Sequence, residues 1–177
     1  MRTPLRRLLA FGADYLVIAV YLVVLFGLSA AALASGIGHV YSAVWSNAES
    51  AELAGFILLT VPVVLYFSIF ESSPRGATPG KRILELRVIR ASGEQLSLGR
   101  SLLRSAVKFL PWELAHFTVW HFVYETAGHH SPPAWTALTL GLVYLLVALF
   151  LVSLFIGREH RTVYDQIAGS RVIDVGD

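Results

Sequence analysis

The sequence predicts an all-α membrane protein, a bundle of four transmembrane helices that carries a small cytoplasmic β-sheet. Composition is the first reason, since 55% of the 177 residues are hydrophobic and 15% are charged, against about 25% charged residues in an average soluble domain. The second reason is a set of long apolar segments, over residues 8–33, 54–70, 109–127 and 134–157. No Pro/Gly/Ser-rich linker or internal repeat divides the chain, so we expect a single domain over residues 1–177.

The placement of basic residues is the third reason. The first seven residues, the insert over residues 71–108 and the tail after residue 157 hold three, eight and three Lys or Arg residues, which accounts for all 14. Four crossings put these regions on one side of a membrane, and the loops on the other side hold none. Because loops rich in Lys and Arg stay in the cytoplasm, we expect an integral plasma (inner) membrane protein with both termini cytoplasmic.

The first predicted span, residues 8–33, contains a carboxylate. Asp14 follows Arg7 by seven residues, which is two helical turns and puts both side chains on one face. A cleaved signal peptide is the alternative, but its apolar core usually has about 7–15 residues, so we expect a retained helix. Burying a carboxylate costs free energy unless a partner or water meets it. Asp14 is therefore the first functional candidate.

The second span, residues 54–70, should bend at Pro62. Proline is tolerated there if a neighbouring helix or a Thr or Ser side chain meets the carbonyl that loses its helical partner, and Thr60 and Ser68 are near in sequence. We therefore expect a kinked helix.

The insert after this span predicts a β-hairpin over residues 83–97, with alternating apolar and polar residues on either side of a polar turn. A tail strand over residues 170–175 should join it, with Asp174 facing basic strand residues. Three strands are about the minimum for a stable sheet, so we expect the insert and the tail to fold together.

Residues 98–108 predict a short helix with Arg100, Arg104 and Lys108 at steps of four. A basic stripe beside an apolar side is typical of a helix that lies in the membrane interface and meets anionic headgroups. A solvated connector is the alternative. The third span, residues 109–127, is the least hydrophobic, and we expect it to cross because the arginines of the tail and the insert otherwise face opposite sides.

Several polar residues are candidates for metal or proton chemistry. Glu113 and His116 are three positions apart and share a helix face. They could bind a metal, relay protons or form a hydrogen-bonded pair inside the bundle, and these alternatives stay open. His39, His129 and His130 lie in the outer loops and are weak metal candidates, because solvated loop histidines are more common.

Residues 76–82, G-A-T-P-G-K-R, suggest a phosphate-binding loop at first sight. Only three residues separate the two glycines, however, and an arginine stands where the motif requires Ser or Thr. We expect a turn that leads into the strand, with Lys81 and Arg82 contacting lipid headgroups or a carboxylate.

These residues together resemble the RDD family of membrane proteins, named for one arginine and two aspartates. Arg7 and Asp14 match the first helix of the family, and Asp165 matches the tail segment Thr-Val-Tyr-Asp-Gln-Ile-Ala-Gly-Ser over residues 162–170. The loop Thr-Pro-Gly-Lys-Arg, which contains Gly80, Lys81 and Arg82, also matches, and so does Arg104. Ser170 stands where the family usually has Thr, and residues 112–133 match no family pattern. The resemblance implies a polytopic membrane protein associated with transport, with some members described as sodium/proton exchangers.

The anchors of this resemblance suggest one arrangement. A bidentate pair between Arg7 and Asp165 would lock the tail against the first helix. Asp14, deeper on the same face as Arg7, would then lie below a plug that the pair forms.

The leading functional hypothesis is a small secondary transporter that exchanges monovalent cations for protons. Asp14 is the exchange carboxylate in this hypothesis, because burial raises the pKa of an acid toward neutrality, and Glu113 and His116 are possible relay groups. Four helices are few for a transporter, so we expect a homo-oligomer, most simply a homodimer. A water-accessible path to Asp14 favours this hypothesis.

The alternative is a non-transporting membrane scaffold or assembly factor, whose cytoplasmic sheet and basic helix bind a partner or anionic lipid. A fully paired Asp14 favours it. We do not expect an enzyme, because no nucleophile–base set is evident, and we expect no cofactor. Nucleic acid is not an expected partner, since the basic residues lie next to membrane spans, where lipid headgroups meet them.

Overall fold

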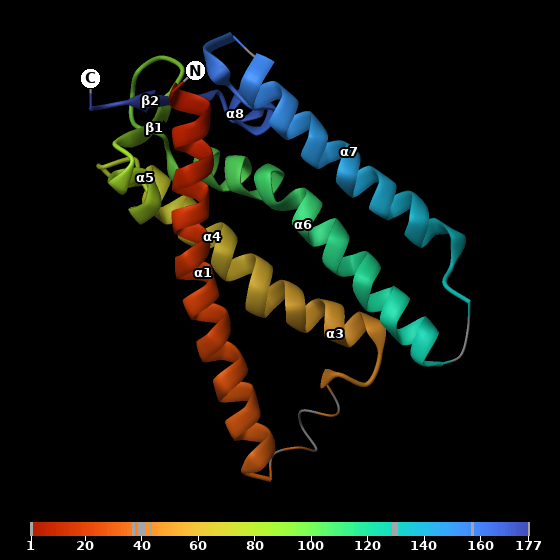
Figure 1. Cartoon of the computed structure of the whole chain (residues 1–177). Helices are drawn as coiled ribbons and strands as arrows, with labels where there is room; N and C mark the ends of the chain where they lie inside the picture. Colours follow the sequence, from red (N-terminus) through yellow and green to blue (C-terminus); the bar gives the residue numbers. More distant parts are fainter. Residues whose placement is uncertain are drawn as a thin grey trace.

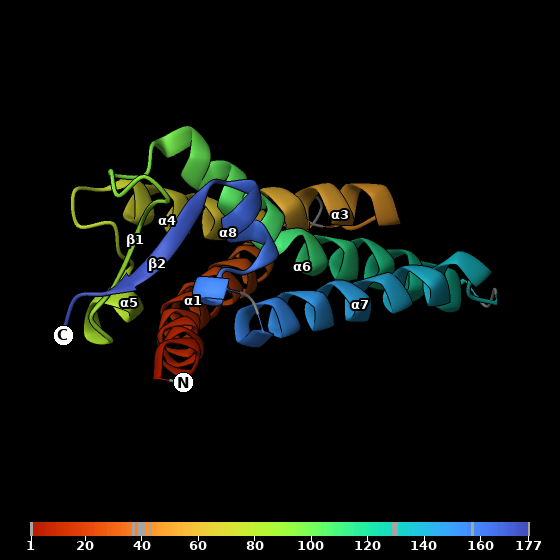
Figure 2. The same cartoon turned by 90° about the horizontal axis from the view of Figure 1, so that it is seen from above.

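The structure is a computed structural model that describes residues 2–36, 38, 42, 44–128, 131–156 and 158–176. Long helices dominate it (Figure 1), namely α1 (Arg2–Ala34), α3 (Ala48–Gly55) with α4 (Val61–Ser72), α6 (Leu98–Ala127) and α7 (Ala134–Ile156). In Figure 1, α1 and α6 run away from the end that holds both termini, and the other two run back toward it. Seen from above (Figure 2), α6 and α7 lie side by side.

Three helices are long and apolar enough to cross a membrane, over Thr3–Ala34, Ala48–Ser72 and Ala134–Ile156. They correspond to the first, second and fourth predicted spans. The third predicted span lies in α6, which is not among these helices, so the count of four spans is not confirmed. The prediction of a separate interfacial helix over residues 98–108 is wrong, because one continuous helix covers 98–127 with Pro111 inside it.

A π-helix, η1 (Phe56–Thr60), joins α3 to α4 just before Pro62. Pro62 has no N–H to donate to the carbonyl of Leu58, four residues earlier. Tyr21 of α1 donates its hydroxyl to that carbonyl instead, over 2.6 Å. A π-helix therefore lies where the bend was predicted, and a neighbouring helix meets the freed carbonyl, which is one of the two predicted alternatives.

The residues beyond the helix ends form a polar head, which we define as residues 73–97 and 159–176. Its sheet has two antiparallel strands, β1 (Leu86–Arg90) and β2 (Ser170–Asp174), with Val88 opposite Val172. The tail strand therefore joins the insert as predicted, but the returning strand of the hairpin is reduced to one bridge between Ile89 and Gln95. The reason is length, since α6 begins at Leu98 and leaves too few residues for a third strand.

Two short helices complete the head. The first, α5 (Pro79–Ile83), replaces the predicted turn, because Thr78 caps it by accepting from the backbone N–H of Lys81. The second, α8 (Val163–Ile167), begins with a capping box in which the side chains of Thr162 and Asp165 each accept from the other's backbone N–H. These caps set where both short helices begin.

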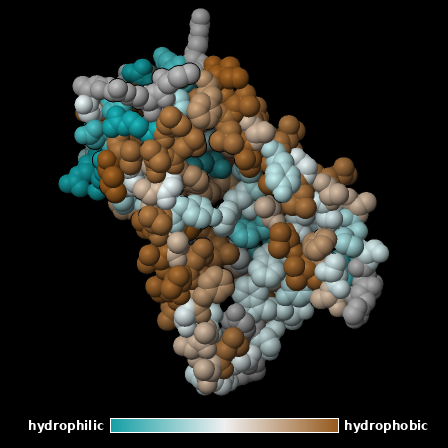
Figure 3. Space-filling model, viewed as in Figure 1, coloured by the Kyte–Doolittle hydropathy of each residue, from teal (hydrophilic) through white to brown (hydrophobic). Residues whose placement is uncertain are grey.

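Two apolar clusters hold the molecule together. One packs the sheet against α1 and contains Ala10, Leu86, Val88, Leu96 and Val172. The other joins α1, α4 and α6 and contains Ile18, Val63, Phe67 and Phe109. Large apolar side chains elsewhere on α1 and α7 remain exposed, and Figure 3 shows hydrophilic residues gathered on the head and apolar residues over the helices. Such an apolar exterior fits a helix bundle whose solvent is lipid.

Candidate functional site

Asp14 is fully buried, with 0% of its surface exposed. Its carboxylate accepts hydrogen bonds from the hydroxyl of Thr78 at 2.6 Å, the backbone N–H of Gly80 at 2.9 Å and the hydroxyl of Tyr66 at 2.9 Å. The donors come from the cap of α5, from α5 itself and from α4. Asp14 therefore joins α1 to two other elements, and all three of these donors are neutral groups.

Gly80 allows this close approach. A Cβ at Gly80 would overlap the carbonyl oxygen of Ala10 and would lie 2.9 Å from Cγ of Asp14. Glycine is consequently the residue that lets the backbone of α5 come within hydrogen-bond distance of a carboxylate on α1. The predicted anchors Asp14 and Gly80 thus meet directly, which their separation in sequence did not reveal.

The remaining charged anchors form a continuous series of buried ion pairs. Asp165 lies between two arginines: Nη2 of Arg7 is 2.6 Å from Oδ2, and Nε of Arg104 is 2.8 Å from Oδ1. Glu71 lies between two cations, 2.5 Å from Nη1 of Arg104 and 2.8 Å from Nζ of Lys81. We call the series Arg7–Asp165–Arg104–Glu71–Lys81 the ion-pair chain. It connects α1, α8, α6, α4 and α5, and all its side chains are at most 9% exposed.

The predicted contact between Arg7 and Asp165 is present, but it is not bidentate. One guanidinium nitrogen of Arg7 contacts Asp165, and another donates to the carbonyl of His160 at 2.5 Å. Arg104 supplies the second cation to Asp165. A contact between these two residues was not predicted from the sequence. The tail is therefore attached to both α1 and α6.

Electrostatics keep Asp165 ionised. Burial by itself raises the pKa of this carboxyl, but the guanidinium groups of Arg104 and Arg7 outweigh burial and hold the pKa well below its ordinary value. Thr162 adds hydrogen bonds from its backbone N–H and its hydroxyl. Burial likewise opposes the charge of Arg104, while Glu71 and Asp165 raise the pKa of its guanidinium. Asp165 and Arg104 are thus held in their ionised forms.

Glu71 is the member of the ion-pair chain that was not among the predicted site residues. It directly follows Phe70 at the end of an apolar run and begins the predicted polar insert over residues 71–108. An acid at the end of an apolar helix, ten residues before Lys81, was the available signal. Similarly, the pattern T-x-x-D over residues 162–165 signals a capping box.

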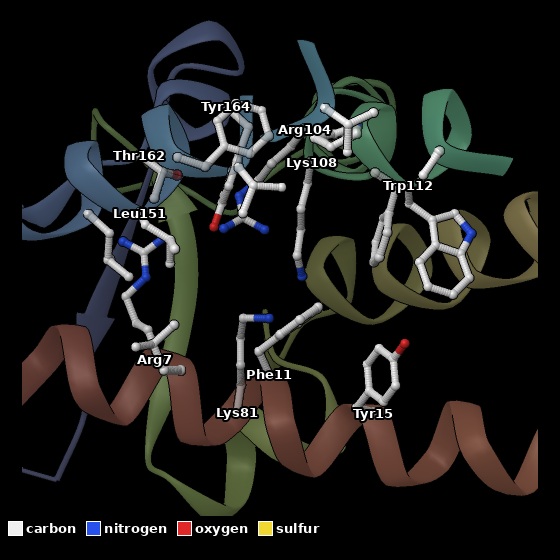
Figure 4. Close-up of a pocket in the computed structure, with 18 residues that line it drawn as sticks. Arg7, Phe11, Tyr15, Lys81, Arg104, Lys108, Trp112, Leu151, Thr162 and Tyr164 are labelled. Carbon is white, nitrogen blue, oxygen red and sulfur yellow. The ribbon is translucent and has the colours of Figure 1, made fainter. Parts of the chain in front are cut away.

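A cavity of about 440 Å³ lies next to the ion-pair chain, between α1, α6 and α7. Figure 4 shows the amino groups of Lys81 and Lys108 and the guanidinium groups of Arg7 and Arg104 directed at the same hollow. Most of the remaining wall is apolar and includes Phe11, Trp112 and Leu151, and Tyr15, Thr162 and Tyr164 also line the cavity. Asp14 does not line this cavity.

Glu113 and His116 lie apart from Asp14. The hydroxyl of Thr60 donates to the Glu113 carboxylate, and the His116 ring packs edge-on against Trp112 with 4.6 Å between ring centroids. Within the described part of the chain, Nδ1 of His116 has no hydrogen-bond partner. The structure therefore does not bring the two predicted relay groups to the predicted exchange carboxylate.

Other predicted contacts differ in their partners. Asp174 pairs with Arg6 of α1 and not with basic strand residues, because the strand opposite presents Leu86. Lys81 meets a carboxylate, as one of its two predicted alternatives required, whereas Arg82 is exposed and donates to the carbonyl of Ala77 at 3.0 Å. His39, His129 and His130 lie outside the described residues. Among the residues described, no group of three or more His, Cys, Asp or Glu side chains could hold a metal ion.

Comparison with known protein families gives one match. A model of the RDD family matches residues 1–169 of the chain. The chain belongs to the RDD family. No curated protein and no solved structure matches it. In this RDD protein the matched region contains Asp14 with its donors and the whole ion-pair chain, from Arg7 to Asp165.

Proposed function

We propose that this RDD protein is a non-transporting membrane scaffold, whose head binds a partner or anionic lipid. The observation that carries the proposal is the environment of Asp14, which is fully buried and accepts three hydrogen bonds from neutral donors. A carboxylate in this position acts as a fixed structural acceptor. Two of its partners, Thr78 and Gly80, belong to the part of the head that must stay in place for Lys81 to join the ion-pair chain.

Exchange at Asp14 conflicts with this structural role. An exchange site must release one cation and take another, so its carboxylate has to change partners during each cycle. Freeing Asp14 from Thr78 and Gly80 separates α5 from α1 and moves Lys81, which belongs to the ion-pair chain. Each cycle would therefore disturb several buried charges at once.

Cation–proton exchange is the second candidate function, and one observation favours it. No Lys, Arg or His of the described residues forms an ion pair with Asp14. A transported cation would therefore not have to displace a basic side chain at this carboxylate.

The proposed orientation puts the head in the cytoplasm, with α6 as the fourth crossing of the plasma membrane. The directions of the helices support it, since α1 and α6 run away from the head and the α3–α4 helix and α7 run back to it (Figure 1). The basic residues support it too, because all 14 lie in the head or in the segments next to it. We further propose a homo-oligomer, in which the apolar helices of two copies pack together.

Single cysteines test this orientation in a chain that has no cysteine of its own. Ser92 lies on the head and Ser131 at the opposite end, and both are exposed. An impermeant thiol reagent added to intact cells should label Ser131→Cys and not Ser92→Cys, with both labelled after lysis. Labelling of Ser92→Cys in intact cells would show that the orientation is the opposite one. Protection of both cysteines in intact cells would show that α6 does not cross the membrane.

Proteoliposomes test scaffold against exchanger. Pulses of Na⁺, Li⁺ and K⁺ should give no proton flux with the wild type or with Asp14→Asn, in preparations whose insertion and monodispersity are verified. Cation-dependent flux that Asp14→Asn abolishes and Asp174→Asn retains overturns the scaffold proposal in favour of exchange. A photo-crosslinker at the exposed Ser92 should then capture one specific neighbour in native membranes. If Glu71→Gln abolishes this capture, the neighbour binds only when the head is intact.

A further inference from the structure

The cavity between α1, α6 and α7 has two chemically distinct ends. Arg7, Lys81, Arg104 and Lys108 line one end, and the walls beyond them are almost entirely apolar. No Asp or Glu is among the described residues that line it. Its volume of about 440 Å³ falls in the usual range of ligand sites, about 300–1,000 Å³. A ligand that fits both ends has an anionic head and an apolar body.

Lys108 is the cation of this end that has no carboxylate. Arg7 and Arg104 contact Asp165, and Lys81 contacts Glu71, whereas no described residue accepts a hydrogen bond from the Lys108 ammonium. This ammonium lies over aromatic rings instead, 3.6 Å from the ring centre of Phe67, 4.4 Å from Phe11 and 5.0 Å from Phe109. Rings attract one side of the ammonium, and its remaining donors are available to an oxyanion.

The charge count at this end of the cavity leaves an excess of positive charge. The cations are Arg7, Lys81, Arg104 and Lys108, and the carboxylates of the same region are Asp14, Glu71 and Asp165. The basic groups therefore outnumber the carboxylates by one, and Lys108 is the basic group without a carboxylate contact among the described residues. A singly charged phosphate diester matches this excess.

The sides of the cavity open toward the surroundings of the bundle. Leu8 of α1 and Val147 and Leu151 of α7 line the cavity and are themselves 37%, 41% and 43% exposed. Both helices are long and apolar enough to cross a membrane, and α1 packs mainly on α5 while α6 packs on α4 and α7. Figure 3 shows the hollow between α1 and the other helices. A ligand entering between α1 and α7 comes from the lipid phase.

We propose that this cavity binds one anionic phospholipid from the surrounding bilayer. Lys108 donates to its phosphate, and an acyl chain lies along the apolar wall that includes Ala115, Val147 and Leu151. This inference rests on the proposed function, which names anionic lipid as a ligand, and it adds one specific lipid site within the bundle. The lipid then contacts α1, α6 and α7 at once and joins the helices that the head holds at one end only.

Native mass spectrometry of the full chain in nonionic detergent measures this binding. Phosphatidylglycerol and phosphatidylcholine with identical acyl chains are compared, together with glycerol 3-phosphate as a soluble anion. We expect wild type to bind one phosphatidylglycerol in preference to phosphatidylcholine, and Lys108→Gln to weaken that binding about tenfold or more, the size of one charge-assisted contact. The matched control Arg75→Gln removes an exposed cation of the head and should leave binding unchanged.

Folding is verified separately, by the thermal midpoint without added lipid. Lys108→Gln should keep or raise this midpoint, since it removes a cation without leaving a carboxylate unpaired. Ala115→Phe, which fills the apolar wall, should also weaken phosphatidylglycerol binding and leave Lys108 in place. Unchanged lipid binding in either variant overturns the proposal. Equal binding of both lipids, or full competition by glycerol 3-phosphate, also overturns it in favour of an unselective or a free-anion site. The lipid-binding assays need no membrane potential or ion gradient. A negative result in them overturns the lipid site alone, whereas cation-dependent proton flux overturns the scaffold proposal.

Discussion

Replacing Asp165 by Asn tests the ion-pair chain most directly. The substitution keeps the size of the side chain, but it removes the negative charge and replaces one carboxylate oxygen by an NH₂ group. This group cannot accept a hydrogen bond from the guanidinium of Arg7 or Arg104. Asp165 is 0% exposed, so the two arginines lose the carboxylate that they share and remain buried. Removing one partner of a buried ion pair costs about 3–5 kcal/mol. We therefore expect the free energy of unfolding to fall by about that amount.

Thermal unfolding in detergent measures this loss. At about 2–4 °C per kcal/mol for a chain of this size, the midpoint of Asp165→Asn should lie about 6–20 °C below that of the wild type. The matched control is Asp174→Asn, which breaks the partly exposed pair with Arg6 and should cost less than about 1 kcal/mol.

A double-mutant cycle separates the interaction energy of Arg7 with Asp165 from the other effects of each substitution. Arg7→Gln added to Asp165→Asn should cost less than Arg7→Gln alone, because the arginine no longer has its carboxylate, and the coupling should be about 0.5–3 kcal/mol. The ion-pair chain does not stabilise the fold as proposed if Asp165→Asn destabilises no more than Asp174→Asn and if the losses in unfolding free energy of Asp165→Asn and Arg7→Gln are additive.

Three further predictions concern the same region. Gly80→Ala should destabilise by about 1–3 kcal/mol, because its Cβ overlaps the carbonyl of Ala10. The control Gly12→Ala on α1 meets nothing within 4 Å and should be neutral or stabilising in denaturation assays. Thr78→Val should cost about 2 kcal/mol by removing both a helix cap and a hydroxyl donor, and Thr78→Ser should recover most of it; equal midpoints for the two variants contradict this. Because the pKa of Asp165 is lowered in the folded state, its stabilisation is present above the unfolded pKa of about 3.9 and is lost as pH falls through the folded value. The midpoint difference between wild type and Asp165→Asn should thus be constant from pH 7 to about pH 5 and shrink in stronger acid.

Much of the helical architecture was predictable, because composition and hydrophobic length act locally. The predicted spans 8–33, 54–70 and 134–157 agree with helices able to cross a membrane. The errors arose where two tendencies compete within a few residues. At 98–127 a change from basic to apolar residues suggested two elements, yet one continuous α6 forms and Pro111 does not end it. At 83–97 the predicted hairpin lost its second strand because the helix that follows begins too early.

The candidate site was predictable in its members and not in its contacts. Arg7, Asp14 and Asp165 stood out from the sequence alone, since charges beside apolar segments need partners. Which partners they take depends on elements far apart along the chain. Asp14 meets Thr78 across 64 positions, and Arg7 meets Asp165 across 158 positions. No local pattern predicts such a meeting.

The sequence by itself therefore determined that this is a membrane protein with apolar spans, a polar head and a small set of charged anchors, because transfer free energies and helix length depend on residue type and spacing. Only the tertiary structure decided that Asp14 is held by neutral donors, that Glu71 completes the ion-pair chain and that Lys108 contacts no carboxylate of the described residues. These properties depend on burial and on close approach, as at Gly80, and both exist only after α1, α4, α5, α6 and α8 have packed together.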